Sequence, residues 1–245
     1  MRLGIFGDIH NNYEALTASY KVLERAGCDQ FVCTGDIVGY GGSPKECIEF
    51  FWEHEIVSVK GNHDHYTTQI GYDWKIQPYA KDVIKWMQDT LDSDYIDWLN
   101  DLPFTYEVAG VQFVHSSLET ADGTSWPYIL DSQTAMFHFF MQMSRFCFYG
   151  HTHIPLLFTI NKGQVVFELL TTRKLPERPI GKYLLNPGSV GQPRDFNSKA
   201  SIKVFDTETC EIELYRINYD IAAAQEKIIK AGLPSELAER LHAGR

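Results

Sequence analysis

Residues 3–10, LGIFGDIH, join a short apolar run to a glycine, an aspartate and a histidine. The same junction recurs at residues 31–36, FVCTGD, and in a longer form at residues 57–64, VSVKGNHD. Short apolar runs bounded in this way predict buried β-strands. The glycine in each junction permits the tight turn that must follow the strand.

The segments between these runs predict helices. Residues 13–26 and 44–54 have apolar residues at helical spacing, and the second segment begins at Pro44, a residue favoured at a helix start. Two more helices are expected over residues 79–90 and 93–99. Strands that alternate with helices predict parallel pairing and an α/β fold.

The second half of the chain predicts further strands. Ala109-Gly110 separates two of them as a two-residue hairpin turn, and residues 161–163, Asn-Lys-Gly, predict another turn. The expected strands cover residues 104–108, 111–115, 146–149, 156–160, 165–170, 202–205 and 211–217.

Helices are also expected in this half, over residues 133–143 and 221–230, with a shorter one beyond Pro234. The first of these carries a stripe of Met and Phe side chains, which we expect to pack in the core rather than against a cofactor. The stripe consists of Met136, Phe137, Phe140 and Met141.

Composition limits the class of protein. The 245 residues are 44% hydrophobic and 13% aromatic, and they contain no repeat, low-complexity tract or linker, so residues 1–245 are expected to form one domain. No window approaches the ~20 apolar residues that cross a membrane, and the N-terminal residues lack a secretory signal pattern. Five scattered cysteines without a C-x-x-C pair predict buried thiols in a reducing compartment, with the cytoplasm as the default.

The formal net charge is −10. This charge argues against broad binding of long nucleic acid, which depends on Lys and Arg neutralising phosphates. A small phosphorylated substrate stays compatible with it, because bound metal ions supply local positive charge.

Two further apolar runs end in histidine. His115 follows residues 111–114, and Gly150-His151-Thr152-His153 follows residues 146–149. Ligands of α/β sheets gather beyond the carboxyl ends of the strands, so these side chains would meet the aspartates of the earlier junctions around one cavity. Buried carboxylates without a positive partner are costly there, and a pair of metal ions bridged by one carboxylate removes that cost.

The motifs resemble, in order and spacing, those of the calcineurin-like metallophosphoesterases: Asp8-x-His10, Gly35-Asp36, Gly61-Asn62-His63-Asp64, His115 and Gly150-His151-x-His153. Residues 35–41, GDIVGYG, and 186–194, NPGSVGQPR, resemble the small bacterial and archaeal phosphodiesterase branch. The resemblance implies the metallo-dependent phosphatase fold, a four-layer α-β-β-α sandwich of two mixed β-sheets flanked by helices.

The resemblance also implies two divalent metal ions per chain, with Asp36 as the bridge. Mn²⁺ is the first choice, and Fe, Zn²⁺, Ni²⁺ and Mg²⁺ are alternatives for a ligand set of nitrogen and oxygen without cysteine. One ion would be held by Asp8, His10, Asp36 and His153, and the other by Asp36, Asn62, His115 and His151.

By the same resemblance, a hydroxide that bridges the metals attacks the phosphoryl group in line with the departing oxygen. His63 would protonate the leaving group or stabilise the charged phosphoryl oxygens, and Asp64 would orient the imidazole of His63. Substrate contacts are expected from Arg194, Tyr40 and Ser189.

Some positions depart from the family pattern. Gly39 and Tyr40 stand where protein phosphatases have an aspartate and an arginine, so Arg194 becomes the candidate for phosphate recognition. Ser116 and Gly42 replace a glycine and a proline that are common in close relatives. Substrate choice is therefore not transferred with the family.

The favoured function is hydrolysis of phosphodiesters, with phosphomonoesters as possible further substrates. Alternatives are a symmetrical dinucleoside polyphosphate hydrolase, a Ser/Thr protein phosphatase, and a non-catalytic interaction scaffold on the same fold. A nuclease on long nucleic acid would want a basic face or an added capping domain, and neither is visible. The expected partner is a small phosphorylated molecule. No membrane association is expected, and homo-oligomerisation is left as an alternative.

Overall fold

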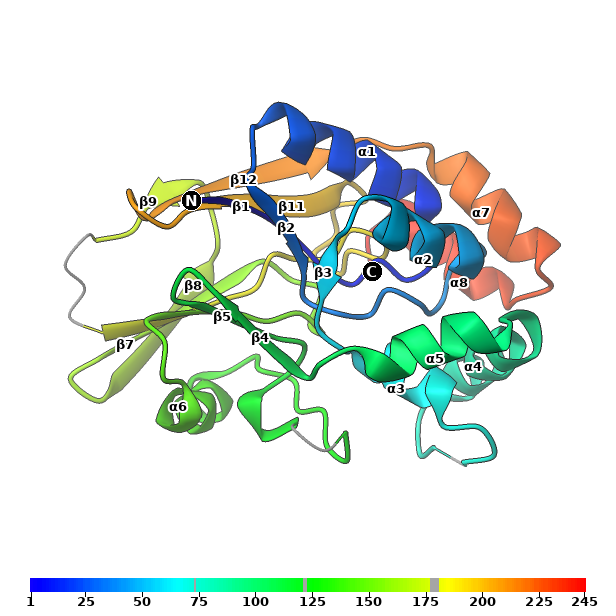
Figure 1. Cartoon of the computed structure of the whole chain (residues 1–245), viewed down its shortest axis with the longest axis horizontal. Coiled ribbons are helices and arrows are strands. Elements are labelled where there is room, and N and C mark those ends of the chain that lie inside the picture. Colours follow the sequence, from blue (N-terminus) through cyan, green and yellow to red (C-terminus); the bar gives the residue numbers. More distant parts are fainter. Residues whose placement is uncertain (73, 121–122, 177–180) are drawn as a thin grey trace.

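The apolar runs form two six-stranded sheets in the computed structural model, which describes residues 1–72, 74–120, 123–176 and 181–245 (Figure 1). The first sheet has the order β3-β2-β1-β11-β12-β9. Its strands are β1 (Arg2–Phe6), β2 (Gln30–Cys33), β3 (Val57–Ser58), β9 (Arg173–Lys174), β11 (Ala200–Asp206) and β12 (Glu211–Ile217). β1, β2 and β3 are mutually parallel, as the alternation of strand and helix predicts, and the other pairs are antiparallel.

The second sheet has the order β4-β5-β6-β10-β7-β8. Its strands are β4 (Thr105–Val108), β5 (Val111–Val114), β6 (Phe146–Phe148), β7 (Leu156–Asn161), β8 (Gln164–Leu169) and β10 (Gly181–Leu185). β5, β6 and β10 are parallel, whereas β4, β7 and β8 pair antiparallel to their neighbours. Both sheets are therefore mixed.

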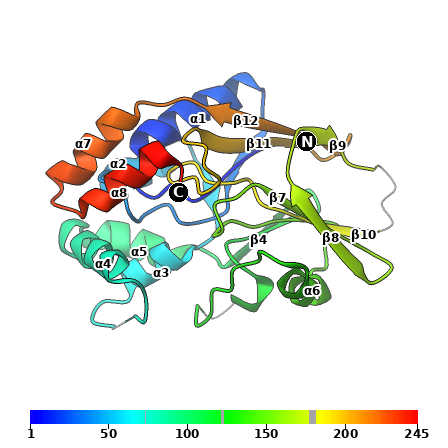
Figure 2. The ribbon, with the colours of Figure 1, turned by 180° about the vertical axis from the view of Figure 1, so that it is seen from behind.

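Helices cover the outer faces of the two sheets (Figures 1 and 2). α1 (Tyr13–Arg25), α2 (Pro44–Glu53), α7 (Ile221–Lys230) and α8 (Ser235–Ala243) share a hydrophobic core with the first sheet, and α6 (Ser132–Met141) packs on the second. α3 (Asn62–Thr68), α4 (Pro78–Thr90), α5 (Ser93–Asp101) and the 3₁₀ turn η1 (Leu118–Thr120) lie beside the sheets. The four-layer α-β-β-α sandwich is thus confirmed.

Phenylalanines join the two sheets in the middle of the sandwich. The ring of Phe205 on β11 lies 4.9 Å from that of Phe146 and 5.6 Å from that of Phe148, both on β6, measured between ring centroids. Phe148 also stacks on Phe113 of β5 at 5.6 Å. Such pairs add about 0.5–1.5 kcal/mol beyond the apolar area that they bury.

Local sequence explains where several elements begin and turn. The Asn12 side chain accepts a hydrogen bond from the Ala15 amide at 3.1 Å and caps α1. Ala109 and Gly110 both have positive φ, 50° and 74°, and make the predicted hairpin turn between β4 and β5.

One prediction about the core is wrong. The buried face of α6 consists of Ala135, His138 and Phe139, while Phe137 and Phe140 are 53% and 76% exposed. Met141 is exposed as well, and Met136 is half-buried. Apolar side chains are spread around this helix rather than gathered on one face, so its sequence period does not identify the face that packs.

Some short elements of the fold are not expected from the sequence. β9, β10 and α3 are not predicted, because β9 has two residues, β10 begins at a glycine, and α3 is short and polar. All five cysteines are free, and four of them are buried. Within the described residues, no helix is both long enough and apolar enough to cross a membrane.

We expect Phe205→Ala to lower the free energy of unfolding by about 3–5 kcal/mol, because it leaves a cavity between the two sheets. Phe196→Ala is the matched control: Phe196 is 83% exposed, and its loss should change stability by less than about 0.5 kcal/mol. Urea unfolding followed by tryptophan fluorescence measures both. Equal losses in the two variants would contradict the inter-sheet packing.

Candidate metal centre

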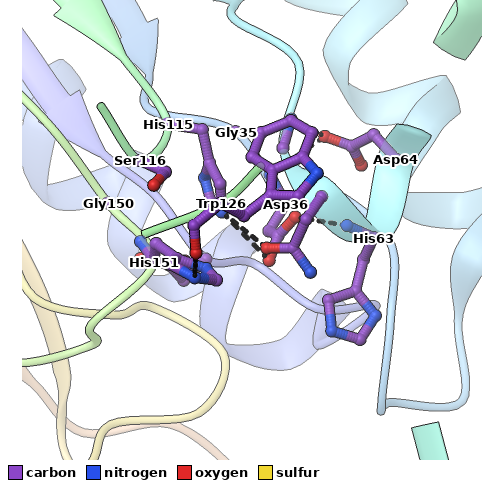
Figure 3. A network of polar contacts seen from close by, with 12 residues as sticks. Gly35, Asp36, His63, Asp64, His115, Ser116, Trp126, Gly150 and His151 are labelled. Carbon is purple, nitrogen blue, oxygen red and sulfur yellow. Dashed lines mark hydrogen bonds and ion pairs between the residues drawn. The ribbon is translucent and has the colours of Figure 1, made fainter. Parts of the chain in front are cut away.

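The polar residues at the strand ends converge on one buried place, where strands of both sheets end. The seven predicted metal ligands follow β1, β2, β3, β5 and β6 in the chain, and none of their side chains is more than 6% exposed. Figure 3 shows His115, His151 and Asp36 pointing toward one another, with His63 beside them. The seven candidates are Asp8, His10, Asp36, Asn62, His115, His151 and His153.

Asp8, His10 and His153 form the first ligand group, with one donor atom each inside 4.8 Å of the others. The Nδ1 atoms of His10 and His153 face the carbonyl oxygens of Val38 and Gln192, at 3.2 and 2.5 Å. Nδ1 therefore carries the proton in each ring, and the two Nε2 lone pairs face each other at 3.1 Å. A cation between them would remove this repulsion.

Asp36, His115 and His151 form the second group. His115 directs Nδ1 to the Thr34 carbonyl oxygen at 2.8 Å, and its Nε2 lies 3.0 Å from the Asn62 amide oxygen. In His151 the ring is reversed, because Nε2 donates to a carbonyl oxygen at 3.1 Å and leaves Nδ1 free as the ligand atom. Asn62 thus lies against the second group, where the resemblance implies a ligand.

Asp36, a member of the second group, also faces His10 of the first. Its Oδ2 is 3.6 Å from His10 Nε2 and 3.4 Å from His115 Nε2, and its Oδ1 accepts a hydrogen bond from the His63 amide at 2.8 Å. Burial is the largest single influence and opposes its ionisation, but the neighbouring histidines, His115 first among them, together outweigh burial and hold the pKa of Asp36 well below its usual range. An ionised carboxylate in this place can contact ligands on both sides.

The Asp8 carboxylate has one oxygen that lacks a partner among the described residues. Its Oδ1 accepts from the His151 amide at 3.0 Å, but its buried Oδ2 has no hydrogen-bond partner among the described residues. Burial raises the pKa of Asp8 to about 7 and lowers that of His10 well below normal. An orphaned carboxylate oxygen beside neutral imidazoles fits a divalent cation, and the nitrogen and oxygen donors suit Mn²⁺, Fe or Zn²⁺.

The backbone is strained around these ligands. Asp8, His10, Asp36, His151 and His153 all have φ between 48° and 67°, in the left-handed region. Such a conformation costs about 1–2 kcal/mol per residue and persists where the surroundings determine it. The strain is concentrated at the ligands, which is typical of a functional site.

Asp64 has a different contact from the predicted one. Its carboxylate accepts hydrogen bonds from the amides of Asp36, Val38 and Gly61 at 2.9, 3.1 and 2.8 Å. The Nδ1 of His63 is buried and has no hydrogen-bond partner among the described residues. The prediction that Asp64 orients the imidazole of His63 is therefore corrected: Asp64 positions the backbone that carries Asp36.

The segment 186–194 supports the histidine loop from behind. Asn186 Nδ2 donates to the Gly150 carbonyl at 2.7 Å and to Thr152 Oγ1 at 3.0 Å. Ser189 is buried, and its hydroxyl donates to the Asp8 carbonyl oxygen at 2.8 Å. Ser189 does not line the described cavity, so the predicted substrate contact is replaced by a structural role.

A cavity of about 280 Å³ opens on the ligands. His63, Tyr40 and Arg194, three of the residues predicted to touch substrate or leaving group, line it. Sequence reasoning missed most of its aromatic wall, since loop and helix-start residues carry no periodic signal. The missed lining residues include Tyr66, Tyr79, Trp126 and Tyr128.

An α-β-β-α sandwich with two adjoining groups of buried candidate metal ligands at its strand ends is typical of the metallophosphoesterases. The chain belongs to the calcineurin-like phosphoesterase superfamily, whose domain it matches over residues 1–210.

Similar proteins match this chain along its whole length. An uncharacterized protein of Methanocaldococcus jannaschii is 36% identical over 247 residues, which cover 99% of this chain and 98% of that protein. The crystal structure of a metallophosphoesterase from Sphaerobacter thermophilus is 33% identical, with a TM-score of 0.84 and coverage of 100% and 99%. A hypothetical protein from Pyrococcus horikoshii shares the fold at 19% identity, with a TM-score of 0.79 and coverage of 100% and 98%.

The two histidines of the loop belong to different ligand groups, so replacing either should weaken a different metal site. We expect His151→Ala and His153→Ala each to lower the Mn²⁺ content from about two ions to about one. The double variant should lose both ions. Metal analysis after dialysis measures the content, and exposed His242→Ala is the control that should retain both.

If the two histidines shared one ion, the double variant would still hold the other. That outcome would contradict the assignment of His151 and His153 to separate groups.

Proposed function

We propose that this chain is a metal-dependent hydrolase of phosphoric esters, with phosphodiesters as its preferred substrates. The observation that carries the proposal is the pair of ligand groups around Asp36, opening on a cavity that also contains His63 and Arg194. Two divalent cations held by these groups would polarise phosphoryl oxygens and activate water as the nucleophile. The remaining tasks fall to side chains of the chain itself.

Arg194 provides fixed positive charge for the phosphoryl group. Its Nη2 donates to Gln192 Oε1 at 3.2 Å, its guanidinium lies 5.9 Å from the centre of the Tyr40 ring, and its buried Nε has no hydrogen-bond partner among the described residues. The guanidinium thus retains a donor for a phosphoryl oxygen in the cavity, where it would balance charge that grows during the reaction.

His63 is the candidate proton donor to the leaving oxygen. Its ring lies 4.5 Å from the ring of Tyr40 and 5.0 Å from that of His10, between centroids, and it lines the cavity. Its backbone amide donates to Asp36, which fixes the start of α3 beside the ligand groups. A positioned imidazole of this kind contributes about 10²–10⁴-fold to the rate.

The setting of the site favours a small substrate. The net charge of −10 disfavours long nucleic acid, and the five free cysteines favour a reducing, cytoplasmic environment. An interaction scaffold would not need both ligand groups, the orphaned Asp8 oxygen and an open cavity together. These features support catalysis over the scaffold alternative.

The proposal is tested with a panel of phosphodiester, phosphomonoester and dinucleoside polyphosphate substrates, each with Mn²⁺, Ni²⁺, Zn²⁺ or Mg²⁺. We expect diester hydrolysis with at least one metal, and its loss in Asp36→Asn together with lowered metal content, because the contact between the two groups is removed. An Asp36→Asn protein with two ions and full turnover would contradict the site. No turnover of any substrate despite bound metal would favour a scaffold.

Replacing His63 separates proton transfer from metal binding. We expect His63→Gln to lower kcat by roughly 10²–10⁴-fold while the metal content stays near two ions. His63 also lies within 4.8 Å of His10 and Asp36 donor atoms, so loss of metal in this variant would identify it as a ligand instead. His242→Gln, at an exposed position, is the matched control and should change neither quantity.

A further inference from the structure

The cavity wall beyond the metal ligands is aromatic. Tyr79 and Trp126 are half-buried and Tyr128 is 49% exposed, so these three rings are open to an occupant of the cavity. Tyr40 and Tyr66 are almost fully buried behind them, and Ile76 and Ala80 add apolar surface. A wall of this composition favours a planar ring over a polar or flexible group.

Two of the open rings are fixed directly to the metal centre. The ring of Tyr128 stacks on His151, with 3.9 Å between centroids and 23° between planes. The Trp126 carbonyl oxygen accepts the hydrogen bond from His151 Nε2 at 3.1 Å, and the indole lies 5.7 Å from the His115 ring. Figure 3 shows Trp126 beside Asp36 and His115. A group that stacks here therefore lies next to the reacting phosphate.

The third open ring comes from another element. Tyr79 is the second residue of α4, a helix that begins with Pro78, and its ring lies 6.2 Å from that of Tyr40. The guanidinium of Arg240 lies 5.8 Å from the centre of the same ring and holds it from α8. The rings of α4 and of the loop with Trp126 and Tyr128 thus line one cavity from two separate segments.

Charge and size limit what accompanies the ring. Among the described residues that line the cavity, Arg194 is the only arginine, and none is a lysine. A chain of several phosphates needs more cationic partners than this. The volume of about 280 Å³ is at the small end of small-molecule sites, which hold ~300–1,000 Å³.

We propose that the substrate is a phosphodiester with one phosphate whose non-leaving ester group carries a planar aromatic ring of the nucleoside kind. The ring packs against Tyr79, Trp126 and Tyr128 while the phosphate lies at the metal centre and Arg194. This inference rests on the proposed phosphoesterase function. It disfavours dinucleoside polyphosphates, which carry several phosphates and a second nucleoside.

The test compares two diesters with the same leaving group, thymidine 5′-(p-nitrophenyl phosphate) and methyl p-nitrophenyl phosphate. Both release p-nitrophenolate, so their kcat/KM ratio reports recognition of the group that stays on the phosphate. We expect a ratio of roughly 5- to 100-fold in favour of the thymidine ester, the range that stacking on an aromatic side chain provides. Cyclohexylmethyl p-nitrophenyl phosphate, apolar but not planar, should behave like the methyl ester.

Variants identify the rings that produce the preference. Tyr79→Leu and Tyr128→Leu should each lower the ratio at least threefold, whereas Tyr79→Phe, which keeps the ring, should leave it within about twofold. Tyr95→Leu is the matched control, since Tyr95 is also near the start of a helix but packs on Trp52 outside the cavity. A ratio near one, or a ratio that neither leucine variant changes, would overturn the inference while leaving the proposed function intact.

Binding measured without turnover separates the two failures. In calorimetric titrations of the Mn²⁺-loaded protein, thymidine 5′-monophosphate should bind roughly 5- to 100-fold more tightly than methyl phosphate, and Tyr79→Leu should lower that difference. If no ester is hydrolysed but this difference is found, the phosphoesterase proposal fails and the aromatic site stands. Equal binding of the two phosphates would reject the aromatic site.

Discussion

The carboxylate of Asp36 is the constraint on which the site depends. It is fully buried, the neighbouring histidines together keep it ionised, and its Oδ2 lies within 3.6 Å of histidines from both ligand groups. Its neighbours are arranged to keep it there. The Asp64 carboxylate accepts a hydrogen bond from the Asp36 amide. A Cβ atom at position 61 would lie 2.1 Å from Oδ1 of Asp36, so only a glycine there leaves room for the Asp36 carboxylate.

The strand arrangement of the sandwich brings the partners of this carboxylate together. Strands from both sheets end at the same place. After β1, β2, β3 and β6 a glycine-containing turn presents the candidate ligands, whereas His115 directly follows β5. Hydrogen bonds from distant segments stabilise the strained backbone. Asn186 donates to the Gly150 carbonyl in the loop of His151, and Ser189 donates to the Asp8 carbonyl. The packing of Phe205 against Phe146 and Phe148 joins the two sheets and so holds their strand ends near each other.

The candidate ligands and the aromatic wall of the cavity come from different parts of the chain. The ligands come from strand ends, whereas Tyr79 comes from α4 and Trp126 and Tyr128 come from the loop after η1. A substitution in α4 or in this loop would change the wall of the cavity without changing a candidate ligand. This division is common in α/β proteins, where a rigid scaffold carries loops that select the ligand.

The sequence by itself predicted the described strands other than β9 and β10 and the polar residues that follow them, because period and spacing are local properties, and the family resemblance then singled out seven ligand candidates. Only the tertiary structure decided the buried face of α6, since apolar side chains are spread around that helix. It also decided the contacts of Asp64 and Ser189, whose partners are backbone groups. The aromatic wall likewise depends on α4 and a loop approaching from separate parts of the chain. Long-range contacts of this kind leave no period in the sequence, because they depend on where complete elements pack.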